Sequence, residues 1–115
     1  MKALRIHRHG TLEQLVIDDI PKPEPGPGEV RVALRSAALN HLDLFVLEGM
    51  PGLTLELPQV CGADGAGVID AVGAGVDGWK RGDRVFINPG WCCGACEFCH
   101  SGEQSLCVKD RKSVV

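Results

Sequence analysis

Five of the six cysteines of this 115-residue chain fall within one short run, WCCGACEFCHSGEQSLC, residues 91–107. The pattern C-x2-C-x2-C-x7-C is formed by Cys93, Cys96, Cys99 and Cys107. Two-residue gaps let the backbone turn around one ion, and the longer gap returns a fourth thiolate that completes a tetrahedron. Four thiolates leave no position open for water or substrate, so the pattern predicts a structural zinc site rather than a catalytic one.

Other interpretations of this run stay open at this point. Disulfides are one, although clustered cysteines in a reducing cytosol are more often ligands. An iron–sulfur cluster fits less well, because the ferredoxin pattern places its fourth cysteine after three residues and before proline. A reactive thiol is a further possibility. Cys92 could replace Cys93 in a C-x3-C register, whereas Cys61 lies far upstream and is expected to be a small buried hydrophobe.

Length and composition indicate one globular domain, with 44% hydrophobic and 23% charged residues. The net charge is −3 with no basic block, which argues against nucleic acid as a partner. No stretch approaches the roughly 20 apolar residues of a membrane span. The first ten residues, MKALRIHRHG, lack the apolar run of a signal peptide. We therefore expect a cytoplasmic protein with no membrane partner.

Hydrophobic periodicity predicts a mainly β chain. Apolar and polar residues alternate in KALRIH, LEQLVIDDI and EVRVALRSAAL, and PKPEPGPGE separates the last two runs. The segment 40–49 instead has helical spacing, with Asn40 available as its N-cap. GAGVIDAVGAGV and GDRVFINPG then read as a strand pair. The prediction is a β-barrel or sandwich with one short helix, followed by a cysteine-rich lobe.

A glycine fingerprint of nucleotide-binding proteins occurs at Gly73, Gly75 and Gly78. This motif binds a dinucleotide only where it opens a helix whose N-terminus receives the pyrophosphate. The following residues, WKRGDRVFIN, contain another glycine and a β-type run. We therefore predict a turn here, and no nucleotide-binding residues within this chain.

Five motifs in order carry a resemblance: PGPGEVRV, ALNHLDLF, GADGAGVIDAVG, GDRVFINPG and the four-cysteine lobe. From Met1 to about Val108 the chain resembles the N-terminal, GroES-like domain of zinc-containing medium-chain dehydrogenases and reductases. The resemblance implies a partly open β-barrel with one short helix and a structural zinc lobe at residues 91–109. It also favours Cys93 over Cys92, because Cys93-Gly94 matches the family's Cys-Gly pair.

The family pairs this domain with a C-terminal Rossmann domain, which this chain lacks. The longer parent is thus expected to use NAD(P), to act on a small-molecule substrate and to form a homo-oligomer. The fragment alone is expected to be inactive. A stand-alone structural zinc-binding or interaction module is the alternative interpretation.

Departures from the family pattern bear on the reaction. Asn40 stands where alcohol dehydrogenases have a cysteine ligand of the catalytic zinc, and Leu42 stands where they have a proton-relay hydroxyl. Their Gly-His-Glu motif appears as Gly62-Ala63-Asp64, so a histidine ligand is missing as well. Carboxamide and alanine cannot replace thiolate and imidazole, which makes a firmly bound catalytic zinc improbable.

The pattern N-x-x-D, by contrast, is similar to the quinone-reductase branch, which transfers hydride without a catalytic metal. The resemblance names Asn40, Asp43 and Asp64 as candidate catalytic residues. His41 is a further candidate that could orient a carbonyl or shuttle a proton, although a solvent-facing histidine at a helix start is the simpler interpretation. Asp64 could equally cap a turn of the glycine-rich strand.

The last six residues, DRKSVV, are expected to be a non-native tail. They match the translation of a common sequencing adapter, GATCGGAAGAGCGTCGTG, and the next adapter triplet is a stop codon. This divides the chain into a truncated GroES-like domain at residues 1–109 and a tail at 110–115, which is left out of the fold prediction.

Overall fold

A computed structural model of the chain describes residues 1–52, 54–109 and 112–113. Most of its regular elements are short strands, which confirms the mainly β prediction. In chain order they are β1 Lys2–Ile6, η1 Leu12–Gln14, β2 Leu15–Asp19, β3 Val30–Ala37, α1 His41–Glu48, β4 Gln59–Val60, β5 Gly65–Val72, β6 Arg84–Phe86, β7 Gly90–Trp91, α2 Glu97–His100, η2 Gln104–Leu106 and β8 Lys112–Ser113.

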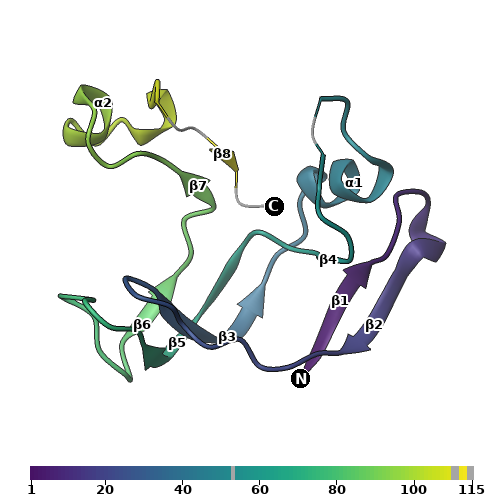
Figure 1. The fold of residues 1–115 in the computed structure, drawn as a ribbon, viewed down its shortest axis with the longest axis horizontal. Helices are drawn as coiled ribbons and strands as arrows, with labels where there is room; N and C mark the ends of the chain where they lie inside the picture. Colours follow the sequence, from purple (N-terminus) through teal and green to yellow (C-terminus); the bar gives the residue numbers. More distant parts are fainter. Residues whose placement is uncertain (53, 110–111, 114–115) are drawn as a thin grey trace.

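The strands form three antiparallel sheets, in the orders β2-β1-β4, β3-β5-β6 and β7-β8. In Figure 1 the first two sheets stand side by side, and α1 lies at the end of the β1-β2 hairpin. The cysteine lobe with α2 and η2 projects from the chain beyond β7. Over the described residues the sheets stay open and do not close into a barrel, as in a partly open GroES-like domain.

The expectation of a single helix is wrong, because α2 is a second α-helix within the cysteine lobe. It spans four residues, a length at which no periodic pattern can form. The predicted helix is α1, which begins one residue after Asn40. Asn40 and Asp43 form a capping box, in which the Asp43 carboxylate accepts the backbone N–H of Asn40 at 2.7 Å.

The glycine fingerprint lies in the connection between β5 and β6, as predicted for a turn. Gly75 and Gly78 have φ angles of 74° and 83°, in the region that favours glycine. A Cβ on Gly73 would lie 1.9 Å from the carbonyl oxygen of Gly26, so this glycine permits close packing against the proline-rich loop. No helix occurs between Val72 and Arg84, and therefore nothing in this connection could receive a pyrophosphate.

The hydrophobic core is small. Ile6, Val46 and Leu47 are its buried centre, and Ile69 is buried separately within β5. Leu39 and Phe86 are 87% and 83% exposed, although both are large apolar residues. The radius of gyration is 15.6 Å, compared with about 13.4 Å for a compact domain of this length. These residues thus form an open scaffold rather than a closed globule.

An ion-pair cluster ties the proline-rich loop to β5. The carboxylate of Asp70 accepts hydrogen bonds from Arg31 Nε at 2.7 Å and from Lys22 Nζ at 2.5 Å. The Arg31 hydrogen bond is the main reason that the pKa of Asp70 falls from 3.8 to about 2. The cluster therefore stabilises the fold only while Asp70 is ionised.

Acid should weaken this cluster in a defined pH window. Because the folded-state pKa is depressed, the stabilisation is complete above the unfolded value of 3.8 and is lost as the pH falls towards about 2. We expect the thermal midpoint of Asp70→Asn to change less than that of the wild type across this window. The exposed Asp77→Asn is the control. If the thermal midpoints of Asp70→Asn and the wild type fell equally with pH, the stabilising role of ionised Asp70 would be contradicted.

The predicted tail at 110–115 lies outside the described residues except for Lys112–Ser113, which form β8 and pair with β7. Among the described residues no helix has the length and apolar character needed to cross a membrane.

Candidate functional site

The cysteine lobe is built from tight turns and two short helices. Cys96 is the N-cap of α2, and Cys107 directly follows η2. Gly94 and Gly102 form turns of the lobe, with φ angles of 69° and 84° in the region that favours glycine. Local backbone geometry thus brings cysteines from both ends of the lobe together.

The four predicted ligands converge on one point. The sulfur atoms of Cys93, Cys96, Cys99 and Cys107 all lie within 4.8 Å of one another. The Cys93–Cys99 and Cys96–Cys99 sulfur separations are 3.9 and 3.5 Å. A tetrahedral metal with sulfur ligands at about 2.3 Å requires sulfur separations of about 3.8 Å. The two separations lie close to this distance, and the four sulfurs together are near enough to hold a zinc ion after small side-chain adjustments.

Neighbouring groups support this arrangement. The backbone N–H of Cys93 donates to Cys107 Sγ at 3.4 Å, and that of Ala95 donates to Cys93 Sγ at 3.5 Å. Such donors stabilise negative charge on ligand sulfurs. None of the six cysteines forms a disulfide, so the disulfide interpretation is not supported. Cys92 is not in the cluster, which places Cys93 in the register that the resemblance favours.

The sulfurs differ in acidity. Burial, followed by the hydrogen bond with Cys96, raises the pKa of the Cys99 thiol to about 12. The pKa of Cys96 is lowered instead, mainly by a hydrogen bond from the Cys99 backbone. The Cys99 thiol is therefore protonated at neutral pH. A bound dication would supply the positive charge that four thiolates require.

The second group of predicted residues gathers where α1 begins. Asp64 stands between β4 and β5 and is 24 residues beyond Asn40 in sequence. Asn40 Nδ2 nevertheless donates to Asp64 Oδ2 at 2.6 Å, and Asp43 accepts the backbone N–H of Asn40. Gly62, with a φ of 99°, turns the chain into this position. Three of the four candidate catalytic residues are thus joined in one hydrogen-bonded group.

A pocket of about 560 Å³ lies beside this group. Asn40, His41 and Asp43 contribute its polar groups. His41 is exposed, as predicted for a helix start, and its ring centroid lies 6.1 Å from that of Phe45. The remaining lining is mostly aliphatic and comes from β1, η1, β2, the end of β3, the link to α1, α1 itself and the segment after β4: Leu4, Leu12, Leu15, Ala37, Ala38, Leu39, Leu44, Leu47, Cys61 and Gly62. A molecule in this pocket would contact apolar walls with a few polar groups at one side.

The sequence interpretation did not include most of these lining residues. Leu4, Leu12 and Leu15 appeared only as strand or loop positions, and no local signal links them to residues about 30 positions later. Cys61 was expected to be buried, and the structure places it partly buried against the core. Burial raises the pKa of its thiol, so Cys61 is the less reactive neutral form.

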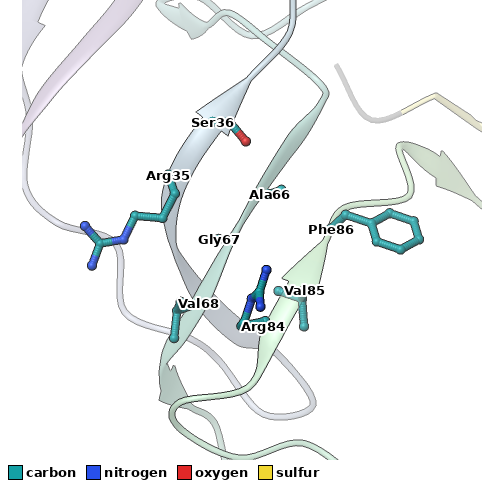
Figure 2. Close-up of a pocket in the computed structure, with 8 residues that line it drawn as sticks. All are labelled: Arg35, Ser36, Ala66, Gly67, Val68, Arg84, Val85 and Phe86. Atoms are coloured by element: carbon teal, nitrogen blue, oxygen red, sulfur yellow. The ribbon is translucent and has the colours of Figure 1, made fainter.

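A second hollow of about 500 Å³ lies across β3, β5 and β6, away from the predicted site. Figure 2 shows Arg35 and Phe86 pointing in opposite directions, away from the middle strand β5. Ala66 and Gly67 leave the middle strand with little side-chain volume. No predicted catalytic or metal-binding residue lines this hollow.

Comparison with known proteins identifies the fold. The family model of the alcohol dehydrogenase GroES-like domain matches residues 26–114. An alcohol dehydrogenase of Schizosaccharomyces pombe is 39% identical over 108 residues, which are 91% of this chain and 30% of that protein. The crystal structure of an NAD-dependent alcohol dehydrogenase is 52% identical with a TM-score of 0.87, over 98% of this chain and 33% of the other.

Two further structures extend the comparison. A cobalt- and zinc-bound thermostable alcohol dehydrogenase from Pyrobaculum aerophilum is 33% identical, with a TM-score of 0.86 over 100% of this chain and 35% of the other. The Escherichia coli quinone oxidoreductase complexed with NADPH is 29% identical, with a TM-score of 0.70 over 75% of this chain and 26% of the other. Both branches of the family are therefore similar to this chain.

The chain belongs to the alcohol dehydrogenase GroES-like domain family. It corresponds to the N-terminal domain of medium-chain zinc-type alcohol dehydrogenases and quinone oxidoreductases. It spans about a third of the length of the relatives that it matches.

Proposed function

We propose that Cys93, Cys96, Cys99 and Cys107 hold one structural zinc ion. The single observation that carries this proposal is the convergence of the four sulfurs within 4.8 Å. Because every ligand is a cysteine, the ion would have no open position and would not act in catalysis. Its role is to hold β7, α2 and η2 in one lobe.

We further propose that this domain works within a longer NAD(P)-dependent oxidoreductase that reduces an aldehyde, ketone, quinone or enone. The hydrogen-bonded group of Asn40, Asp43 and Asp64 beside an apolar pocket supports this proposal. Similarity to an NAD-dependent alcohol dehydrogenase and to an NADPH-bound quinone oxidoreductase supports the choice of cofactor. The proposal includes a small-molecule substrate and a cytoplasmic, homo-oligomeric longer protein, as the resemblance implies.

The longer protein should reduce its substrate with one zinc ion per chain. Asn40 and Ala63 stand where a catalytic zinc would need ligands, and Asn40 Nδ2 already donates to Asp64. The test is to express the reading frame that continues beyond Lys109 and to measure its zinc content. Oxidation of NADH and NADPH is then followed with benzaldehyde, acetophenone, menadione and cyclohexenone.

Two outcomes would oppose the proposal in different ways. Two zinc ions per chain, with activity lost when the weaker one is removed, would show that a catalytic metal is present. A longer protein that binds one zinc but no nicotinamide cofactor would favour the stand-alone zinc module instead.

A further inference from the structure

We propose that Asp64 is a positioning residue that holds the Asn40 carboxamide in one orientation, an arrangement called the lock below. In this orientation the amide nitrogen of Asn40 serves as a hydrogen-bond donor to a substrate carbonyl oxygen. This inference rests on the proposed reductase function. It assigns to a neutral donor the polarising role that a metal would otherwise have.

The lock follows from the chemistry of the partners. An ionised carboxylate only accepts hydrogen bonds, so Asp64 selects the nitrogen of the Asn40 amide, at 2.6 Å, and repels its oxygen. The backbone N–H of Asp43 donates to the backbone carbonyl of Asn40 at 3.1 Å, so Asp64 is the neighbour that selects the amide orientation. A flipped amide would face this carboxylate with its oxygen. Asp64 therefore favours one orientation.

One N–H of Asn40 stays available in this orientation. The amide nitrogen carries two hydrogens, and one of them is donated in the hydrogen bond to Asp64. Asn40 also lines the 560 Å³ pocket, so the second hydrogen can reach a molecule bound there. A nicotinamide held by the longer protein would supply hydride to a carbonyl carbon, and the carbonyl oxygen would then receive the C=O electron pair and a proton from solvent. A fixed N–H donor at that oxygen stabilises the developing charge.

Asp43 supports the same arrangement from the backbone. Its carboxylate accepts the Asn40 N–H at 2.7 Å, which fixes the residue at the first turn of α1. Asn40 is thus held through its main chain by Asp43 and through its side chain by Asp64. Such a doubly held donor needs little reorganisation during reaction.

The lock can be tested by NMR of the longer protein, without activity. The assigned side chain of Asn88, the other asparagine of these 115 residues, is an internal control. The Asn88 side chain accepts a bond from Gly90 through its oxygen. We expect one side-chain amide proton of Asn40 to exchange more slowly than those of Asn88 at neutral pH. In Asp64→Asn this protection should disappear, whereas Asp77→Asn should keep it. Equal exchange of the Asn40 and Asn88 protons in the wild type would overturn the inference.

Kinetics of the longer protein test the role of the donor. Asn40→Asp, which removes the N–H groups at constant shape, should lower kcat about 100-fold, as loss of one oxyanion donor does. Asp64→Asn should lower kcat about ten-fold with an unchanged KM for the nicotinamide. Asp64→Glu keeps an acceptor-only group and should retain more activity than Asp64→Asn. If Asp64→Asn had the wild-type kcat, or lost stability in proportion to activity, the positioning role would be wrong.

Failure of this inference can be separated from failure of the proposed function. A longer protein that reduces carbonyls while its Asn40 amide exchanges freely would keep the function and reject the lock. A protected Asn40 amide in a longer protein that reduces none of the four carbonyl probes would reject the proposed function, and with it the role of the donor.

Discussion

Replacing Cys96 by serine is expected to abolish stoichiometric zinc binding and to unfold the cysteine lobe. Cys96 is buried, caps α2 and lies 3.5 Å from the Cys99 sulfur, so its loss removes a ligand from the centre of the lobe. Zinc binding to small structural sites contributes apparent free energies of about 10–16 kcal/mol, which are also folding energies. Metal analysis of the purified protein, with amide-proton spectra of residues 93–107, measures both effects.

Cys92→Ser is the matched control, because Cys92 lies one residue from a ligand but outside the sulfur cluster. It should retain one zinc per chain and the wild-type lobe spectrum. Zinc lost in Cys92→Ser and kept in Cys93→Ser would mean that the register is wrong.

The cysteine lobe shows what sequence spacing can predict. Four ligands separated by two, two and seven residues can close around an ion through local turns alone, and the structure brings the same four together. The choice between Cys92 and Cys93 needed more than spacing, because both registers permit closure. It came from the family resemblance, and the cluster agrees with it. Helix α2 was missed because four residues carry too little periodicity.

Prediction was weaker where distant segments meet. The alternating runs predicted β1, β2, β3 and the β5–β6 pair, because a period-two pattern depends only on residues that are neighbours in sequence. The hydrogen bond between Asn40 and Asp64 joins α1 to the segment before β5, and only the resemblance pointed to both residues. Nothing in the sequence required that Asp64 accept a bond from Asn40 rather than cap a turn. The leucines from β1 and η1 reached the pocket through tertiary packing, which no periodicity describes.

The open architecture also affects how function is divided along the family's polypeptide. Asn40 and Asp64 lie beside an apolar pocket, yet the described strand pairs are all antiparallel, so the described residues contain no parallel strand–helix–strand unit for a dinucleotide. Hydride transfer requires the nicotinamide to be held against the substrate. Under the proposed function the site would orient a substrate, and the cofactor would be held by residues other than those described.

The isolated 115-residue chain is accordingly expected to show no dehydrogenase activity and no saturable binding of NADH or NADPH. Its glycine fingerprint lies in the β5–β6 turn, where no helix N-terminus meets it. We also expect an early, weakly cooperative thermal transition and aggregation that increases with concentration. The core is centred on three buried residues, and β3 and β6 are the edges of their sheet among the described strands.

A charge on an exposed edge should separate aggregation from unfolding. Phe86 is 83% exposed on β6, so Phe86→Lys removes an apolar contact surface with little loss of core packing. This variant should aggregate less than the wild type at equal concentration while it keeps one zinc per chain and the same early transition. Light scattering measures aggregation, calorimetry measures the thermal transition, and a nicotinamide fluorescence titration measures cofactor binding. A sharp transition together with micromolar nicotinamide binding by the isolated chain would contradict both the incomplete core and the turn assignment of Gly73, Gly75 and Gly78.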